Sequence, residues 1–219
     1  MKILIACEES QVECIAFREK GHEAYSCDIQ ECSGGHPEWH INQDVIPLLN
    51  GSCEFTTEDG VNHVIKGKWD MIIAHPPCTY LTNTGSRWYD VSKYGAKAIE
   101  RERERAVEFF MRFVNADCDK VAIENPVGYM NSHFRKADVI YNPYDFENET
   151  ECKKTCLWLK GLPKLHGTRK EPLPKEQRTT NGFKAIFNGK QYRWNDPLVA
   201  KLRSKTPLGV ARAMAEQWG

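Results

Sequence analysis

The chain has 219 residues, of which 41% are hydrophobic and 27% charged, which is ordinary for a soluble globular protein with one sizeable domain. No apolar run approaches the ~20 residues of a membrane span, and the first ten residues turn acidic too early for a secretory signal, so we expect neither a membrane span nor a secretory signal. The nine cysteines follow no regular framework and indicate free thiols in a reducing compartment, so we expect a cytoplasmic protein.

The net charge is zero, but the charges are unevenly distributed. Residues 160–205 carry 12 Lys and Arg residues against 3 acidic ones, whereas residues 1–159 carry 17 basic and 26 acidic residues. A basic segment beside an acidic body is typical of a surface that faces a polyanion, and a solvated basic tail is the alternative. We therefore expect a core at 1–159, a small basic region at 160–195 that contacts nucleic acid, and carboxy-terminal helices at 196–219 that pack on the core.

The first 28 residues have the pattern of a strand, a helix and a second strand. Lys2–Cys7 is a short apolar run, and Ser10 with Glu13 three residues later forms a capping-box signature for the following helix. Glu23–Cys27 is the second strand, and Asp28 follows it. An acidic residue at the tip of such a strand can hold the two hydroxyls of a ribose, as in dinucleotide-binding folds.

A third strand and a hairpin precede the central strand. Asn42–Val45 marks the end of the third strand, and two alternating segments around Asp59-Gly60 predict a hairpin insertion. Trp69–Ala74 is apolar enough to be covered on both faces, as in a parallel sheet. Two prolines then end this strand, because they cannot donate ladder hydrogen bonds, and they present Cys78 on a stiff turn.

The second half of the chain alternates strand and helix less regularly. Thr79–Tyr94 is polar and aromatic, and we expect a mobile loop beside the active edge. Ala96–Ala116 is predicted to be a long amphipathic helix, and Lys120–Ile123 a short buried strand. The remaining predictions are a strand at Lys154–Leu159, a hairpin around Asn188-Gly189 and a last helix at Leu208–Trp218.

Polar side chains follow the predicted strand ends. They are Cys7, Glu8, Glu9, Asp28, Asp44, Cys78 and Glu124. Because the carboxyl ends of parallel strands meet at one edge, this pattern predicts a doubly wound α/β sheet with its chemistry at that edge. Cys78 and Glu124 end strands expected to be neighbours, which favours attack by a thiolate while the carboxylate binds a ring nitrogen of the substrate. A buried structural cysteine is the alternative for Cys78.

In the order of its motifs the chain resembles the DNA cytosine-5 methyltransferases, and most closely the short phage- and prophage-type proteins with a reduced target-recognition region. The matching segments are Leu4–Ser10, Asp28, Asp44-Val45, Pro76-Pro77-Cys78, Glu124-Asn125 and Thr206–Trp218. The resemblance implies a class I S-adenosylmethionine-dependent methyltransferase fold with a Rossmann-like sheet. It implies methyl transfer to carbon 5 of cytosine in DNA through a covalent cysteine adduct, in a bacterial cell and encoded by the cell or by a phage.

The resemblance also implies a role for each matching residue. Cys78 would attack carbon 6 of a flipped-out cytosine, Glu124 would hold ring nitrogen 3 and the exocyclic amine, and Asn125 would brace the Pro-Pro-Cys turn. S-adenosyl-L-methionine would contact Ala6, Cys7, Glu8, Ser10, Asp28, Ile29, Asp44, Val45, His75 and Pro76, with Asp28 on the ribose and Asp44 and Val45 on the adenine. The base and its DNA would contact Pro77, Thr79, Arg87, Trp88, Lys154 and Thr155.

Three features depart from the family pattern. The turn after the first strand, Ala6–Ser10, contains no glycine, so its side chains crowd the expected cofactor. The family's Gln-x-Arg-x-Arg is absent, and Lys153-Lys154-Thr155 stands in the comparable place. The basic region is too small for the usual specificity domain, so we expect short or relaxed sequence specificity.

Other functions and ligands remain open. The same chemistry could act on a free nucleotide, single-stranded DNA or RNA, and a non-catalytic nucleic-acid-binding relative is an alternative from another class. Cys27, Cys32, His36 and His40 lie close in sequence, but their spacing fits no standard zinc finger or ribbon, so we expect no metal. We expect no membrane association and no obligate protein partner.

Overall fold

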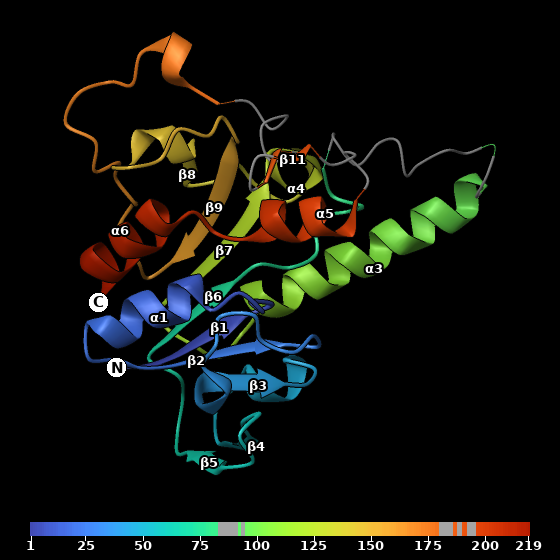
Figure 1. The fold of residues 1–219 in the computed structure, drawn as a ribbon. Helices are drawn as coiled ribbons and strands as arrows, with labels where there is room; N and C mark the ends of the chain where they lie inside the picture. Colours follow the sequence, from blue (N-terminus) through green and yellow to red (C-terminus); the bar gives the residue numbers. More distant parts are fainter. Residues whose placement is uncertain (83–91, 93–94, 180–185, 188–189, 192–195) are drawn as a thin grey trace.

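The computed structural model describes residues 1–82, 92, 95–179, 186–187, 190–191 and 196–219. Its centre is a seven-stranded sheet in the order β3-β2-β1-β6-β7-β9-β8 (Figure 1). The parallel strands are β1 (Lys2–Ala6), β2 (Glu23–Asp28), β3 (His40–Asn42), β6 (Met71–Ala74) and β7 (Val121–Pro126). The expected α/β fold with a mostly parallel, Rossmann-like sheet is confirmed.

The strand order reverses between β1 and β6, which is the switch point where open α/β sheets bind ligands. Ala6 at the end of β1 pairs with Cys27 on one side and with Ala74 on the other. Ala74 in turn pairs with Ile123 of β7. Strands β1, β2 and β6 therefore end at nearly the same level, whereas β7 continues to Pro126 beside the segment that follows β6. The segments after β1, β2 and β6 meet along one edge, as the sequence predicts.

Strand β6 is buried on both faces, as its apolar sequence predicts. Met71 and Ile73 pack into a layer with α1 (Val12–Glu19) and α6 (Leu208–Trp218), which lie side by side in Figure 1. Ile72 and Ala74 pack into the opposite layer, which contains α3 (Ala96–Val114). Full burial of each large apolar side chain contributes about 1.5–3 kcal/mol, so the two layers hold the central strand in place.

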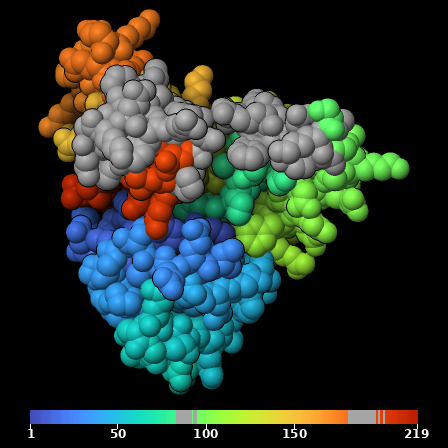
Figure 2. Space-filling model, turned by 45° about the vertical axis from the view of Figure 1, so that its right-hand side comes forward, coloured from blue at the N-terminus to red at the C-terminus, as the bar shows by residue number. Residues whose placement is uncertain are grey.

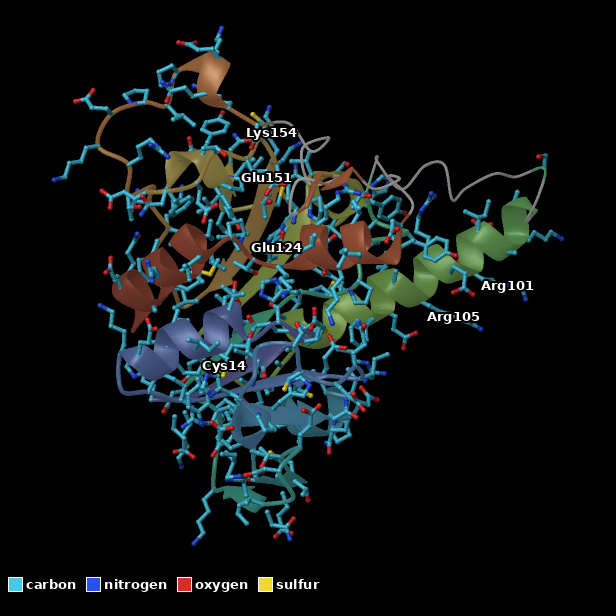
Figure 3. The ribbon with its side chains drawn as sticks, viewed as in Figure 1. Cys14, Arg101, Arg105, Glu124, Glu151 and Lys154 are labelled. Atoms are coloured by element: carbon cyan, nitrogen blue, oxygen red, sulfur yellow. The ribbon has the colours of Figure 1, made fainter. Side chains whose placement is uncertain are left out.

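Helix α3 occupies the range that its apolar stripe predicts. Ile99, Phe110 and Phe113 are buried on one side, and Phe110 and Phe113 join the core of the sheet. The opposite side is charged, and Arg101 and Arg105 point away from the body of the molecule (Figure 3). The first turns of α3 extend beyond the sheet in Figure 1, so the helix is anchored mainly through its second half.

The sheet gains two antiparallel strands in the carboxy-terminal half, one predicted at Lys154–Leu159 and an edge strand at 139–141 that the sequence did not predict. Strand β9 (Thr155–Lys160) runs antiparallel to β7, and the edge strand β8 (Val139–Tyr141) pairs with β9. The prediction that the strand before Glu124 ends at Ile123 was wrong. Residues 124–126 stay in β7 because they pair with β9, and Pro126 opposes Thr155 there although it lacks an N–H.

Two short helices were given no bounds by the sequence-based prediction, although the second lies within the carboxy-terminal helices expected at 196–219. Helix α4 (Tyr129–His133) follows β7, and α5 (Pro197–Ser204) begins where the Asp196 side chain accepts a hydrogen bond from the Leu198 N–H. Both are too short for a clear periodic pattern. The 3₁₀ helices are η1 (Pro37–Trp39), η2 (Ile46–Leu48), η4 (Pro143–Asp145) and η5 (Lys175–Gln177).

Both predicted hairpins are present. Strands β4 (Cys53–Thr56) and β5 (Asn62–Ile65) form an antiparallel insertion before β6. Strands β10 (Ile186–Phe187) and β11 (Lys190–Gln191) form a second, shorter pair within the basic region. Among the helices that the structure describes, none combines the length and the apolar character needed to cross a lipid bilayer.

Candidate active site

The Pro-Pro turn after β6 is fixed at both ends. At its start, the His75 N–H donates to the carbonyl of Ala6 at 2.9 Å. Within the turn, the buried Asn125 side chain donates from Nδ2 to the carbonyl of Pro76 at 2.8 Å. After it, the carbonyl of Cys78 accepts hydrogen bonds from the N–H groups of Leu81 and Thr82. Asn125 thus makes the bracing contact expected of it, and Cys78 is held between two anchored segments.

A close backbone approach secures the far side of this turn. The Tyr129 N–H donates to the carbonyl of Leu81 at 2.7 Å, and Thr82 forms an isolated bridge with Gly128. A Cβ atom at Gly128 would lie 2.1 Å from the carbonyl oxygen of Leu81, a distance that no side chain tolerates. Glycine is therefore required at position 128, and the segment that follows Cys78 is held against the one that follows β7.

Removal of the Asn125 brace is expected to destabilise the protein. In Asn125→Ala the carbonyl of Pro76 loses its buried donor, so the free energy of unfolding should fall by about 1–3 kcal/mol in a urea titration. Asn42→Ala, at an exposed residue on the sheet edge, is the matched control and should change it by less than about 0.5 kcal/mol. Equal losses in both variants would contradict the bracing role.

Cys78 is half-buried, and its thiol is held in the protonated form. Burial is the main cause that raises the pKa of Cys78, and the negative charge of Glu124 raises it further. Lys153 and Arg203 act in the opposite direction but do not overcome these effects. The resting thiol therefore needs a change in its surroundings, such as a bound cationic or polar ligand, before it becomes a strong nucleophile.

Glu124 lies at the centre of the molecule, on β7 (Figure 3). Burial favours its neutral form, but the hydrogen bond from His75 and the positive charge of Lys153 prevail and bring the pKa of Glu124 below its ordinary value. Its Oε2 lies 3.3 Å from Nδ1 of His75. Its Oε1 is buried and accepts no hydrogen bond from the residues that the structure describes. This oxygen is therefore free to accept an N–H of a bound ligand.

His75 bridges Glu124 to helix α1. Its Nε2 lies 2.6 Å from Oε2 of the fully buried Glu13, and its Nδ1 faces Glu124. Burial works against the charged imidazole, but the two carboxylates hold the pKa of His75 well above its usual range. His75 was predicted to contact the cofactor, and the structure instead places both of its ring nitrogens on protein carboxylates.

The capping box predicted for the first helix was wrong. The residue before α1 is Gln11 in a left-handed conformation, and the side chain of Ser10 makes no capping bond. The Glu8 carboxylate takes this place and accepts hydrogen bonds from the N–H groups of Glu13 at 2.7 Å and Cys14 at 3.3 Å. The Glu8 side chain from the preceding turn reaches the helix end more directly than the Ser10 hydroxyl, and its two oxygens accept N–H groups that the first turn of a helix leaves unpaired.

The turn from β1 into α1 is consequently filled by protein side chains. Burial and the nearby Glu13 raise the pKa of Glu8 to about 8. Gln11 packs so tightly against Gly34 that a Cβ there would lie 2.5 Å from the Gln11 Cβ, so a glycine from the following loop closes the turn. Glu9 is also buried and lies 3.5 Å from Lys201 of α5, which brings the carboxy-terminal segment against this edge, as Figure 2 shows.

The residues predicted to hold a nucleoside gather beside this turn. Asp28 and Asp44 follow β2 and β3, and both raise the pKa of the Cys7 thiol, although burial is the larger cause. Ile29 exposes 79% of its surface next to Asp28, whereas Val45 is buried. The carboxylates of Asp28 and Asp44 each accept one local N–H through Oδ1, from Gln30 and Ile46 respectively. Among the described residues, none donates a hydrogen bond to their Oδ2 atoms.

On the opposite side of Cys78, the nearest cations differ from the predicted ones. Lys154 is exposed (Figure 3). Thr155 is buried, and its hydroxyl donates to the carbonyl of Lys153. Lys153 acts on both Cys78 and Glu124, and its Nζ donates to the carbonyl of Arg203 at the end of α5. Sequence reasoning missed Lys153, Arg203 and Glu13. Only the position of Lys153 in a Lys-Lys-Thr run gave any signal.

The remaining predicted residues divide into two groups. Pro76 is buried, whereas Pro77 and Thr79 are exposed beside Cys78, where a substrate could reach them. Arg87 and Trp88 lie outside the described residues, as does most of the expected loop. In the described ranges no three His, Cys, Asp or Glu side chains come together as a metal site. His40 instead bonds Ser26 and the carbonyl of Gln30, and His36 stacks on Trp39.

No protein-family model matches the chain, and no curated protein matches it. Its function must therefore be inferred from the geometry of its own side chains and from the order of its motifs.

Proposed function

We propose that this protein transfers a methyl group from S-adenosylmethionine to carbon 5 of cytosine in DNA, with Cys78 as the covalent nucleophile. The observation that carries the proposal is that a thiol held on a fixed turn after β6 lies close enough to an ionised carboxylate on the adjacent parallel strand β7 for the carboxylate to act on it. Asn125, next to the carboxylate, braces the turn that presents the thiol. The same three residue types stand in the motifs by which the chain resembles the cytosine-5 methyltransferases.

The two groups have complementary tasks. The Cys78 thiol gives up its proton to water as its sulfur adds to carbon 6 of cytosine, and the electron pair of the ring double bond becomes available at carbon 5. S-adenosylmethionine, when bound, would supply the methyl group to that carbon and depart as the neutral thioether S-adenosylhomocysteine. Glu124 accepts the exocyclic amine on Oε1 and steadies the pyrimidine during the addition. Loss of the carbon 5 proton to water and departure of the Cys78 sulfur then restore the ring and the enzyme.

The edge beside β1 favours a cofactor without phosphates. A dinucleotide places its pyrophosphate on the N-terminus of the helix after β1, but Glu8 already occupies that position here. The carboxylates of Asp28 and Asp44 suit ribose hydroxyls and an adenine amine, and the exposed Ile29 offers an apolar face for the base. A nucleoside carrying an amino acid, such as S-adenosylmethionine, meets these conditions better than a nucleotide does.

A nucleic acid substrate is supported by the charges near Cys78. Lys153 and Arg203 lie close enough to act on its thiol, and the basic region supplies further cations for phosphate contact. The pyrimidine must leave its stack for Cys78 to reach carbon 6, and flipping costs a few kcal/mol in a duplex. Single-stranded DNA is the second candidate substrate, because the region at 160–195 is small for a domain that recognises a duplex sequence.

Cofactor binding and methyl transfer test the proposal directly. Isothermal titration should show binding of S-adenosylmethionine and no binding of NAD, because of Glu8. Transfer of a labelled methyl group should then be measured on duplex DNA, single-stranded DNA, RNA and dCMP. Product on DNA supports the proposal, product on RNA or dCMP alone reassigns the substrate, and absence of both cofactor binding and transfer overturns it.

A further inference from the structure

A buried ion-pair chain runs from α1 to β7, and two of its three members, Glu13 and His75, have no role in the reaction described above. It consists of Glu13, His75 and Glu124, and the outer carboxylates belong to different elements. Only 13% of the His75 side chain is exposed, and Glu13 is fully buried. Buried ionic groups are costly unless they are fully paired, so a chain of this kind needs a compensating reason to persist. His75 immediately precedes the Pro-Pro-Cys turn, so we expect these buried charges to serve the active site.

The geometry leaves one oxygen of Glu124 for His75 and the other for a ligand. Oε2 faces Nδ1 of His75, whereas Oε1 is buried without a hydrogen bond from the described residues. The parallel register places residue 75 opposite residue 124, one step beyond the Ala74–Ile123 pair, so the imidazole faces the carboxylate directly. A carboxylate clamped through one oxygen cannot rotate freely, and the direction of the other oxygen is therefore set by the imidazole.

Glu13 fixes the imidazole in turn. Its Oε2 binds Nε2 of His75, and its backbone N–H is held by Glu8 at the start of α1. Because both ring nitrogens face carboxylates, the arrangement requires protons on both nitrogens, which is the cationic form. A neutral imidazole would leave one of the two carboxylates facing a lone pair.

We propose that His75, held by Glu13, is a positioning residue that orients Glu124 and keeps it ionised for recognition of the pyrimidine. This inference rests on the proposed function for its substrate but not for its geometry. His75 itself does not touch the reacting atoms. It acts through Glu124, and through Glu13 it ties the base-binding side of the site to the helix that borders the cofactor side.

The titratable groups around His75 and Glu124 come from several elements. They are Glu8 before α1, Glu13 on α1, Cys78 after β6, Tyr141 on β8, Lys153 before β9 and Cys156 on β9. Lys153 favours the ionised form of Glu124 independently of His75, and it remains when His75 is replaced. The effect of His75 on the ionisation of Glu124 should therefore be partial, and it should be visible as a shift in pH dependence.

The first part of the test needs no substrate. The pKa of His75 is raised in the folded state, so its ion pairs contribute full stability below about pH 6.5 and lose it as the pH rises through the folded value. The difference in unfolding free energy between the wild type and His75→Asn should therefore be larger near about pH 6 than near about pH 10. If this difference in unfolding free energy does not change with pH, the proposed ion pairing of His75 with Glu13 and Glu124 is wrong, whatever reaction the protein catalyses.

The second part measures kcat/KM for methyl transfer against pH. In His75→Asn the acid limb, which reports ionisation of Glu124, should move to higher pH, and kcat/KM at neutral pH should fall about 10–100-fold, as for loss of an outer hydrogen-bond partner. Glu13→Gln should give a smaller loss of the same kind, and His133→Asn, at an exposed residue of α4, should match the wild type. If kcat/KM in His75→Asn falls by the same factor at every pH, His75 contributes only to folding, and the proposed positioning role is wrong.

The two parts separate the inference from the proposed function. If the wild type transfers no methyl group but the stability difference depends on pH as expected, the ion pairing of His75 with Glu13 and Glu124 is supported and the proposed reaction is wrong. If the wild type is active and neither the stability nor the acid limb responds to His75→Asn, the proposed reaction stands and the inference fails.

Discussion

Cys78→Ala should abolish methyl transfer and remove the covalent adduct with DNA that contains 5-fluorocytosine. Fluorine at carbon 5 cannot leave as a proton does, so the wild-type enzyme should become trapped after the methyl group has been transferred. The alanine variant has no sulfur to add to carbon 6, and no adduct can form. Loss of the nucleophile in a covalent mechanism costs several orders of magnitude, so residual transfer should be at least about a thousandfold slower.

The adduct is measured as a gel-shifted, denaturation-resistant complex, with its site assigned by mass spectrometry. Cys152→Ala is the matched control, because Cys152 is also a half-buried free cysteine beside the basic region. It should form the adduct at the wild-type rate. Binding of S-adenosylmethionine should survive in Cys78→Ala, which shows that the protein is folded. Methyl transfer that persists in Cys78→Ala would refute the covalent mechanism.

Glu124→Gln should change the reactivity of Cys78 and the rate of methyl transfer in opposite directions. The charge of Glu124 raises the pKa of Cys78, so its removal should make the thiol ionise at lower pH and react faster with iodoacetamide near neutral pH. Methyl transfer should nevertheless fall by about 10²–10⁴-fold, because the amide cannot hold the cytosine in the way that the carboxylate does. Alkylation is followed at Cys78 by peptide mass spectrometry, and transfer by the labelled methyl group.

Faster alkylation of Cys78 together with slower methyl transfer distinguishes this prediction from a general loss of structure. A variant that merely loosened the fold would expose all the buried cysteines, whereas here alkylation should increase at Cys78 and not at the buried Cys14 or Cys156. Glu23→Gln, at the exposed start of β2, is the control and should leave both measurements unchanged. Faster transfer in Glu124→Gln would mean that the carboxylate only restrains the thiol, and it would contradict a role in substrate recognition.

Much of the amino-terminal half was predictable because its signals are local. An apolar run followed by two prolines indicates a buried strand that ends before them, and β6 ends at Ala74 as predicted. The positions of Asp28, Asp44 and Cys78 at one edge follow from the rule that parallel strands present their carboxyl ends together. The carboxy-terminal half was harder, because β8 and α5 are short and acquire stability mainly from their neighbours.

The candidate site was likewise predictable from the sequence only in part. The residue types that define it, a thiol behind two prolines and a carboxylate followed by asparagine, could be identified from sequence because each belongs to a compact motif. The partners that tune them could not, because Glu13, His75 and Lys153 come from three separate segments. The capping prediction for Ser10 failed for a related reason. Its spacing to Glu13 was correct, but only the folded turn determined that Glu8 reaches the helix end first.

The sequence by itself therefore determined the alternation of strands and helices and the one edge at which the polar residues gather, since both depend on short-range patterns of apolar and polar residues. The tertiary structure alone decided the protonation states, because these depend on burial and on charges distant in sequence. It leaves Cys78 as a protonated thiol, Glu124 as an ionised carboxylate and His75 as a cation between two acids. The Pro-Pro turn sets where the thiol stands, and the residues around it set when the thiol can react.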